Sequence, residues 1–314
     1  MNADDSIYVA GHRGLAGSAI VRALTQRGYH NIVTRPRAEL DLRDQAAVEA
    51  FFAEHRPVYV FMAAAKVGGI LANDTYPAEF LSDNLAIQNN VITSAQRHEC
   101  KKLLFLGSSC IYPKFAEQPI REDSLLTAPL EPTNEWYAIA KIAGIKMCQA
   151  LRKQYGFNAI SAMPTNLYGP GDNFDLQNSH VLPALMKKFH LAHRAGEPSV
   201  IVWGTGTPRR EFLHVDDLAD ALIHLMLNYD SEEIINVGVG ADISIRELAE
   251  LMKDIVGYAG AIEFDPTKPD GTPRKLLDIT RIQETGWQAR IGLEGGIRST
   301  YEWFLENVAE TACA

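Results

Sequence analysis

The sequence predicts an α/β fold built on a doubly wound parallel sheet, followed by a smaller α/β C-terminal substrate domain. Short apolar runs of strand length alternate with amphipathic segments in the first half of the chain. After about residue 165 this alternation gives way to a stretch rich in glycine, proline and asparagine, and then to helical segments separated by loops. Alternating strands and helices favour a parallel sheet, because each helix returns the chain to the edge where the next strand begins.

The individual elements follow from these patterns. Strands are expected at residues 7–10, 31–34, 59–63, 103–106 and 159–163, and helices at 18–27, 45–55, 83–98 and 136–155. Two further helices are expected at 182–195 and 244–256. We expect a first domain over residues 1–165 and a second over 166–314, with the segment 211–240 returning to the first.

Composition restricts the class of protein. With 314 residues and 46% hydrophobic content the chain can bury a sizeable core, and its net charge of −9 argues against a nucleic-acid partner. No apolar stretch reaches the length of about 18 residues that a membrane helix needs, and two acids precede the first apolar run. The sparse cysteines include no C-x-x-C pair, which favours a reducing compartment; they are Cys100, Cys110, Cys148 and Cys313. We therefore expect a cytoplasmic protein that does not bind membranes.

A glycine-rich turn follows the first predicted strand directly and leads into a helix. Glycines let the backbone approach a pyrophosphate, and the helix N-terminus offers free N–H groups and the positive end of its dipole. The spacing G-x-x-G-x-x-G also suits an ordinary tight turn, but its place between strand and helix favours a dinucleotide site in a Rossmann-type fold. The candidate cofactor contacts are Gly11, His12, Arg13, Gly14, Leu15, Ala16 and Gly17.

The end of the second predicted strand is basic. NAD-specific enzymes usually place a carboxylate here, whereas this chain has Arg35 and Arg37, which with Arg13 could hold a 2′-phosphate. NADP(H) is therefore the expected cofactor, although a pair of solvated surface arginines that binds no ligand would give the same sequence pattern. Farther along, Asp41 and Leu42 could contact the adenine, and the small residues Ala63 and Ala64 end the third strand.

A tyrosine and a lysine lie four positions apart on the predicted helix 136–155. Tyr137 and Lys141 share one helix face, and Ser108 follows the preceding strand. A serine there can hydrogen-bond a carbonyl oxygen while Tyr137 exchanges a proton with it. Because a free tyrosine has a pKa of about 10, we expect Lys141 to lower the pKa of Tyr137.

Together, the glycine turn, Ser108, the Tyr137/Lys141 pair and the segment 166–170 resemble the extended short-chain dehydrogenase/reductases. The segments 63–70, 107–114, 130–134, 164–170 and 178–180 narrow the resemblance to the enzymes that make GDP-L-fucose. It implies epimerisation of GDP-4-keto-6-deoxy-D-mannose at carbons 3 and 5, reduction at carbon 4 by NADPH, and a homodimer. The further cofactor contacts that it implies are Leu106, Gly107, Ser108, Ser109, Tyr137, Lys141, Pro164, Thr165, Asn166, Leu167 and His180.

The resemblance also implies roles for residues whose type alone predicts no function. It makes Cys110 a base and His180 an acid for epimerisation, beside Ser108, Tyr137 and Lys141; by type alone, a cysteine is more often a core residue and a histidine a surface residue. For the GDP-sugar it implies contacts from Lys188, Trp203, Arg210 and Asp270. Without it, a lone tryptophan suggests core and Arg209-Arg210 a solvated pair.

Two rival functions remain open. A 4-epimerase or 4,6-dehydratase of the same fold would recycle tightly bound NAD, and Arg37 together with the Cys110/His180 pair counts against it. A non-catalytic dinucleotide sensor would not need the intact pair Tyr137 and Lys141. No cluster of His, Cys and acidic residues has metal-ligand spacing, and the acidic pair at 216–217 resembles a structural motif, so no metal is expected.

Overall fold

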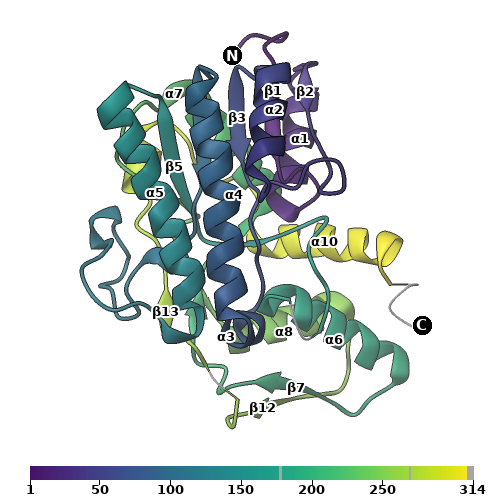
Figure 1. Ribbon diagram of the computed structural model, residues 1–314. Coiled ribbons are helices and arrows are strands. Elements are labelled where there is room, and N and C mark those ends of the chain that lie inside the picture. The colour runs from purple at the N-terminus through teal and green to yellow at the C-terminus, as the bar shows by residue number, and fades with distance from the viewer. Residues whose placement is uncertain (177–178, 269, 310–314) are drawn as a thin grey trace.

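The computed structural model describes residues 1–176, 179–268 and 270–309. A parallel six-stranded sheet forms its centre, in the order β10-β5-β4-β3-β1-β2 (Figure 1). The strands are β1 (Ile7–Ala10), β2 (Ile32–Val33), β3 (Tyr59–Met62), β4 (Lys102–Leu106), β5 (Ala159–Pro164) and β10 (Ile235–Val237). The predicted doubly wound sheet is thus confirmed.

Helices cover both faces of this sheet, because side chains alternate along each strand. On β1, Tyr8 packs into a core under three helices, while Ile7 and Val9 pack into a second core on the opposite face. The first core lies under α2 (Gln45–His55), α4 (Pro77–Arg97) and α5 (Glu135–Tyr155). The second lies under α1 (Leu15–Gln26) and α7 (Val215–Asn228). In Figure 1, α4 and α5 stand side by side in front of the sheet.

The largest difference from the predicted elements is at α4, which begins at Pro77 rather than at residue 83. Proline at the first helical position is a start signal, since its missing N–H would have no partner there. The first turn already carries a buried apolar residue, Phe80, which the predicted bounds left out of the helix. A short helix, α3 (Ile70–Thr75), precedes it.

The C-terminal part of the chain has a third core of its own. Helices α6 (Val181–Ala195), α8 (Ile245–Val256) and α10 (Leu293–Asn307) enclose it, and α9 (Thr280–Glu284) lies between the last two in sequence. Ser244 caps α8 in a reciprocal pair with Glu247. The strand pairs are β7 (Ser199–Trp203) with β12 (Ala261–Asp265), β6 (Asn166–Tyr168) with β9 (Phe212–His214), and β8 (Arg209–Arg210) with both β11 (Ile243–Ser244) and β13 (Arg274–Lys275).

Within the described residues, no helix has both the length and the apolar character that crossing a membrane requires. Helices α6, α8 and α10 cover the core of the C-terminal part, and α1, α2, α4, α5 and α7 cover the two faces of the sheet.

A buried lysine joins the sheet to the end of α7. Lys102, the first residue of β4, donates hydrogen bonds to the carbonyl oxygens of Leu225, Met226 and Tyr229 at 3.0, 2.7 and 2.6 Å. A cation at a helix C-terminus is favourable, because the unpaired carbonyls carry partial negative charge. Burial nevertheless lowers the pKa of Lys102 to about 8.

Replacing Lys102 by methionine removes the donor for these three carbonyls. We expect Lys102→Met to lower the free energy of unfolding by about 2 to 3 kcal/mol, the cost of leaving buried acceptors unpaired. Urea denaturation followed by circular dichroism measures this. The exposed neighbour gives the control, Lys101→Met, which should shift the midpoint little. Equal midpoints for the two variants would show that Lys102 does not hold the end of α7.

Candidate active site

A single cleft of about 1190 Å³ runs along the carboxyl ends of β1, β3, β4 and β5 and continues between them and the C-terminal part. Ligands of open α/β sheets bind at this edge. All of the site residues predicted from the sequence line the cleft except His12. Partial burial, and then the charge of Arg13, lower the pKa of His12. Asn178, part of the predicted motif 178–180, lies outside the described residues.

The glycine turn fits a dinucleotide pyrophosphate. Gly11 has φ +82°, and a Cβ atom there would lie 2.7 Å from the backbone of Ala64. A Cβ on Gly17 would collide with the carbonyl oxygen of Gly11. Helix α1 begins directly after Gly14, with no side-chain cap and no acidic residue in its first turn. Its free N–H groups therefore face the cleft as an anion site.

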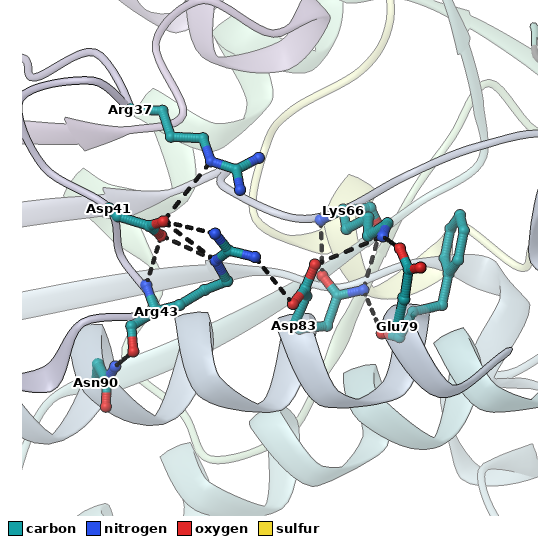
Figure 2. Close-up of polar contacts among 9 residues, drawn as sticks. Arg37, Asp41, Arg43, Lys66, Glu79, Asp83 and Asn90 are labelled. Carbon is teal, nitrogen blue, oxygen red and sulfur yellow. Dashed lines mark hydrogen bonds and ion pairs between the residues drawn. The ribbon is translucent and has the colours of Figure 1, made fainter. Parts of the chain in front are cut away.

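At the adenosine end, Asp41 holds Arg37 less closely than it holds Arg43 (Figure 2). Its side chain is 73% exposed, and its Nε lies 3.8 Å from Asp41. Asp41 binds Arg43 more closely, at 2.7 Å, and this pairing lowers the pKa of Asp41 to about 2. Arg35 turns back to the carbonyl oxygen of Thr34. The Arg37 guanidinium is thus exposed and only loosely paired, as binding a 2′-phosphate would require.

The same ion-pair network fixes the loops around the cofactor cleft. Arg43 also reaches Asp83 on α4 at 3.3 Å, and Asp83 lies 3.5 Å from the ammonium of Lys66 (Figure 2). Lys66 also pairs with Glu79, and its backbone exchanges two hydrogen bonds with the side chain of Asn84. Two loops that follow strands are thereby tied to one helix.

Ser108, Tyr137 and Lys141 meet at the end of β4, and the structure corrects one expectation about them. Lys141 donates to the carbonyl oxygen of Leu106 at 2.8 Å and lies 5.8 Å from the centre of the Tyr137 ring. Burial lowers the pKa of Lys141 to about 8. The pKa of Tyr137 is raised, by burial and then by the charge of Cys110, although Ser108 opposes this. The predicted lowering by Lys141 was wrong, and Tyr137 holds its proton.

Cys110 and His180 form the second titratable set. Cys110 follows β4 in a short 3-10 helix (Ser109–Ile111), and its N–H donates to Ser108 Oγ. Burial raises the pKa of Cys110, but Lys275, whose Nζ lies 3.4 Å from Sγ, and hydrogen bonding to Ser108 bring it below the usual value. His180 precedes α6, and burial, followed by the charge of Lys275, lowers its pKa. Relative to the free side chains, the site therefore shifts Cys110 toward the thiolate and His180 toward the neutral imidazole.

The far end of the cleft suits a nucleoside diphosphate. Trp203 is 49% exposed, not part of the core, and Lys188 and Lys268 lie 5.2 and 5.4 Å from its ring centre. Arg210 donates to the backbone oxygen of Asp270, whose carboxylate accepts a hydrogen bond from Thr205 N–H. Exposed aromatic faces stack on bases, and the lysine and arginine side chains can meet phosphates.

Reasoning from the sequence missed several residues that line the cleft. Lys275 lies 165 positions from Cys110, so no local pattern could pair them. Asn134 Oδ1 and Ser179 Oγ are buried without a hydrogen-bond partner and line the same cleft. Unpaired buried oxygens are costly, which indicates ligand contacts. Their segments, 130–134 and 178–180, carried the sequence resemblance, but no role was assigned to either residue.

The acidic pair at 216–217 has a structural role, as expected. Asp217 accepts the N–H groups of Arg290 and Ile291 at 3.0 and 2.8 Å, and Asp216 pairs with Arg22 on α1. Over the described ranges, no three His, Cys, Asp or Glu side chains gather closely enough to hold a metal ion.

The chain is similar in sequence to known proteins. The chain matches the model of the NAD dependent epimerase/dehydratase family over residues 7–238. It is 63% identical to GDP-L-fucose synthase 1 of Arabidopsis thaliana, over 96% of this chain and 94% of that protein. It is 56% identical to GDP-L-fucose synthase of Escherichia coli (strain K12), over 96% and 97%.

A solved structure of similar fold has NADP bound. The GDP-L-fucose synthetase of Naegleria fowleri bound to NADP is 32% identical and superimposes with a TM-score of 0.89, covering 98% of this chain and 96% of that one. Sequence identity and fold therefore agree over nearly the whole chain. The chain belongs to the NAD dependent epimerase/dehydratase family and, within it, to the GDP-L-fucose synthases.

Proposed function

We propose that this protein converts GDP-4-keto-6-deoxy-D-mannose into GDP-L-fucose, epimerising carbons 3 and 5 and then reducing the carbon 4 ketone with NADPH. One observation carries the proposal: a single cleft holds two separate acid–base sets. Cys110 and His180 form one, with lowered pKa values, and Tyr137 with Lys141 forms the other, in which the phenol holds its proton. Two kinds of proton transfer on one sugar can each use a set of its own.

Epimerisation begins with loss of a proton from a carbon next to the ketone. The thiolate of Cys110 takes this proton, and the electron pair moves to the ketone oxygen as an enolate. Ser108 and Tyr137 can both donate hydrogen bonds to that oxygen and stabilise its charge. His180 returns a proton to the opposite face, which inverts the carbon. Its lowered pKa makes the imidazolium a stronger acid, although less of it is present at neutral pH.

Reduction uses the second set. NADPH, when bound, supplies a hydride to carbon 4. Tyr137 then gives its proton to the carbon 4 oxygen, and its raised pKa ensures that the proton is there to give. Lys141 lies 5.8 Å from the ring and stabilises the phenolate that remains. Arg37 and Arg13 would hold the 2′-phosphate, and the turn after β1 the pyrophosphate.

The GDP part of the substrate is held by residues of the C-terminal part. Trp203 stacks on guanine, and Lys188 and Arg210 meet the diphosphate. Residues 1–165, together with 211–240, would form the cofactor domain, which β10 supports by pairing with β5. Residues 166–314 would provide the remainder as the substrate domain.

The proposal is tested in heavy water. Wild-type protein with GDP-4-keto-6-deoxy-D-mannose and NADPH should give GDP-L-fucose with deuterium at carbons 3 and 5. Cys110→Ser replaces a thiol by a hydroxyl that is hardly ionised near neutrality, so incorporation should fall about 100-fold or more. Nuclear magnetic resonance of the product measures deuterium at each carbon. Cys100→Ser is the matched control, because burial raises the pKa of Cys100 to about 12 and it cannot act as a base.

Two results would contradict the proposal. Wild-type protein that leaves this sugar unchanged but oxidises NADPH with another nucleotide's keto-sugar acts on a different substrate. Full incorporation at both carbons in Cys110→Ser would remove the thiol from the mechanism and leave His180, or a residue not named here, as the base.

The protein also has a surface suited to a homodimer. Helices α4 and α5 pack against each other on one side of the molecule (Figure 1), and α5 exposes Trp136, Ile139 and Tyr155. Exposed apolar side chains on a helix that packs beside a second one favour a two-fold four-helix bundle. A cytoplasmic location is supported by the thiol chemistry, since the described cysteines are free and Cys110 must stay reduced to act as a base.

Light scattering at micromolar concentration tests the dimer. Wild type should give twice the 34.7 kDa chain mass. The double change Trp136→Glu and Ile139→Glu should give the mass of one chain, since it places charges in the interface. Leu227→Glu, at an exposed position on α7, should leave the dimer intact. A single-chain mass for wild type would refute the dimer.

A further inference from the structure

Lys275 and Cys110 meet from opposite sides of the cleft. Cys110 belongs to the turn that follows β4, and Lys275 is the last residue of β13. The Lys275 ammonium lies 3.4 Å from the Cys110 sulfur, within the range of a hydrogen bond to sulfur. β13 pairs with β8 in parallel, Lys275 opposite Arg210, which gives the lysine a fixed backbone position.

Lys275 has no competing anion among the residues that the structure describes. No carboxylate there forms an ion pair with it, whereas the nearby Lys114 is taken by Glu131 at 2.7 Å. The carboxylate of Asp270 accepts from Thr205. The charge of Lys275 is therefore available to the sulfur.

The other charged and titratable groups that act on this sulfur leave Lys275 as its nearest cation. Arg210, on β8, also favours the thiolate but only through its charge, while Lys275 adds a hydrogen bond. Ser108 contributes a hydrogen bond from the turn itself. Tyr137 is neutral when protonated, and burial and the charge of Lys275 disfavour the protonated form of His180. Neither side chain is therefore a cation that stabilises the thiolate. Only one of these groups is both charged and in contact with Sγ.

We propose that Lys275 is a positioning residue that pairs with Cys110 and holds its sulfur as the thiolate that deprotonates carbons 3 and 5. This inference rests on the proposed function, and it adds a residue from the C-terminal part of the chain to the epimerisation step. Hydride transfer does not require the pair, because it uses Tyr137 and Lys141.

The chemistry balances without a further reactant. The carbon–hydrogen bond of the substrate breaks, a sulfur–hydrogen bond forms on Cys110, and the electron pair goes to the ketone oxygen. Lys275 keeps its proton throughout and only donates a hydrogen bond. His180 delivers one proton to the carbon, so the proton on sulfur must return to the imidazole through solvent before the second carbon is epimerised, and again before the next turnover. Nothing is oxidised or reduced.

The first measurement needs no substrate. The rate at which iodoacetamide alkylates Cys110 is followed against pH, with the labelled peptide quantified by mass spectrometry, because only the thiolate reacts. A neighbouring cation favours the charged form, so its removal raises the pKa and moves the profile to higher pH. Lys275→Met and Lys275→Gln should shift the midpoint upward by about one unit or more, and Lys275→Arg should restore it to within a few tenths.

Arg274→Met is the matched control. Arg274 is the other residue of β13, pairs with Asp242 and does not line the cleft. Its alkylation profile should equal that of wild type. A general distortion of β13 would shift both profiles, whereas the proposed pair affects only the variants that remove the charge at 275.

The second measurement is deuterium incorporation at carbons 3 and 5 at neutral pH. One unit in the pKa of Cys110 changes the thiolate fraction about tenfold, so Lys275→Met and Lys275→Gln should lose about tenfold. Raising the pH should recover the loss, and Lys275→Arg should retain most of the incorporation. A raised KM with a wild-type alkylation profile would instead make Lys275 a substrate contact and overturn the inference.

Failure of the inference can be told from failure of the proposed function. If Cys110→Ser loses incorporation but the Lys275 variants keep the wild-type alkylation midpoint, the thiol is the base and the pairing is wrong. If Cys110→Ser keeps incorporation, the base assignment itself is wrong. The alkylation profile is independent of both outcomes, since it reads the sulfur alone.

Discussion

The site depends on one buried carboxylate. Glu211, fully buried between β8 and β9, accepts the N–H groups of Val239 and Gly240 on one oxygen and that of Leu277 on the other. Three charge-assisted hydrogen bonds offset the cost of burying the charge, although burial still raises the pKa of Glu211. They join the end of the central sheet to the segment after β13. Arg210 precedes Glu211 by one position, and Lys275 precedes Leu277 by two. The hydrogen bonds of Glu211 therefore hold both cations at the cleft.

Burial and charge set the protonation states of the two acid–base sets inside the cleft. Burial acts on Tyr137 and keeps its proton on the phenol, as proton delivery to a ketone oxygen requires. Burial is the largest single effect on the pKa of Cys110, but Lys275, Ser108 and Arg210 together outweigh it and shift Cys110 toward the thiolate, as proton removal from carbon requires. Both side chains act on one sugar. Because burial dominates at Tyr137, this residue keeps the proton that an acid needs. Because charges and hydrogen bonds dominate at Cys110, this residue shifts toward the deprotonated form that a base needs.

Much of this could be predicted from the sequence because it is local. The strands β1, β3, β4 and β5 ended close to where the apolar runs end, and the Tyr137/Lys141 spacing placed both residues on one helix. Contacts between distant segments could not be read in the same way. The sequence does not show that Lys141 turns to the carbonyl of Leu106, that Lys275 reaches Cys110, or that His12 does not line the cleft, because tertiary packing decides each of them.

The central claim is that epimerisation and reduction use separate proton-transfer groups, and Tyr137→Phe tests it most directly. NADPH oxidation and deuterium exchange into the sugar are measured on the same sample in heavy water. The account predicts that oxidation falls by about 100-fold or more, the contribution of a general acid, while exchange at carbons 3 and 5 falls far less, because Ser108 still stabilises the enolate. The exposed Tyr155→Phe on the same helix should change neither rate. Equal loss of both rates in Tyr137→Phe would contradict the account.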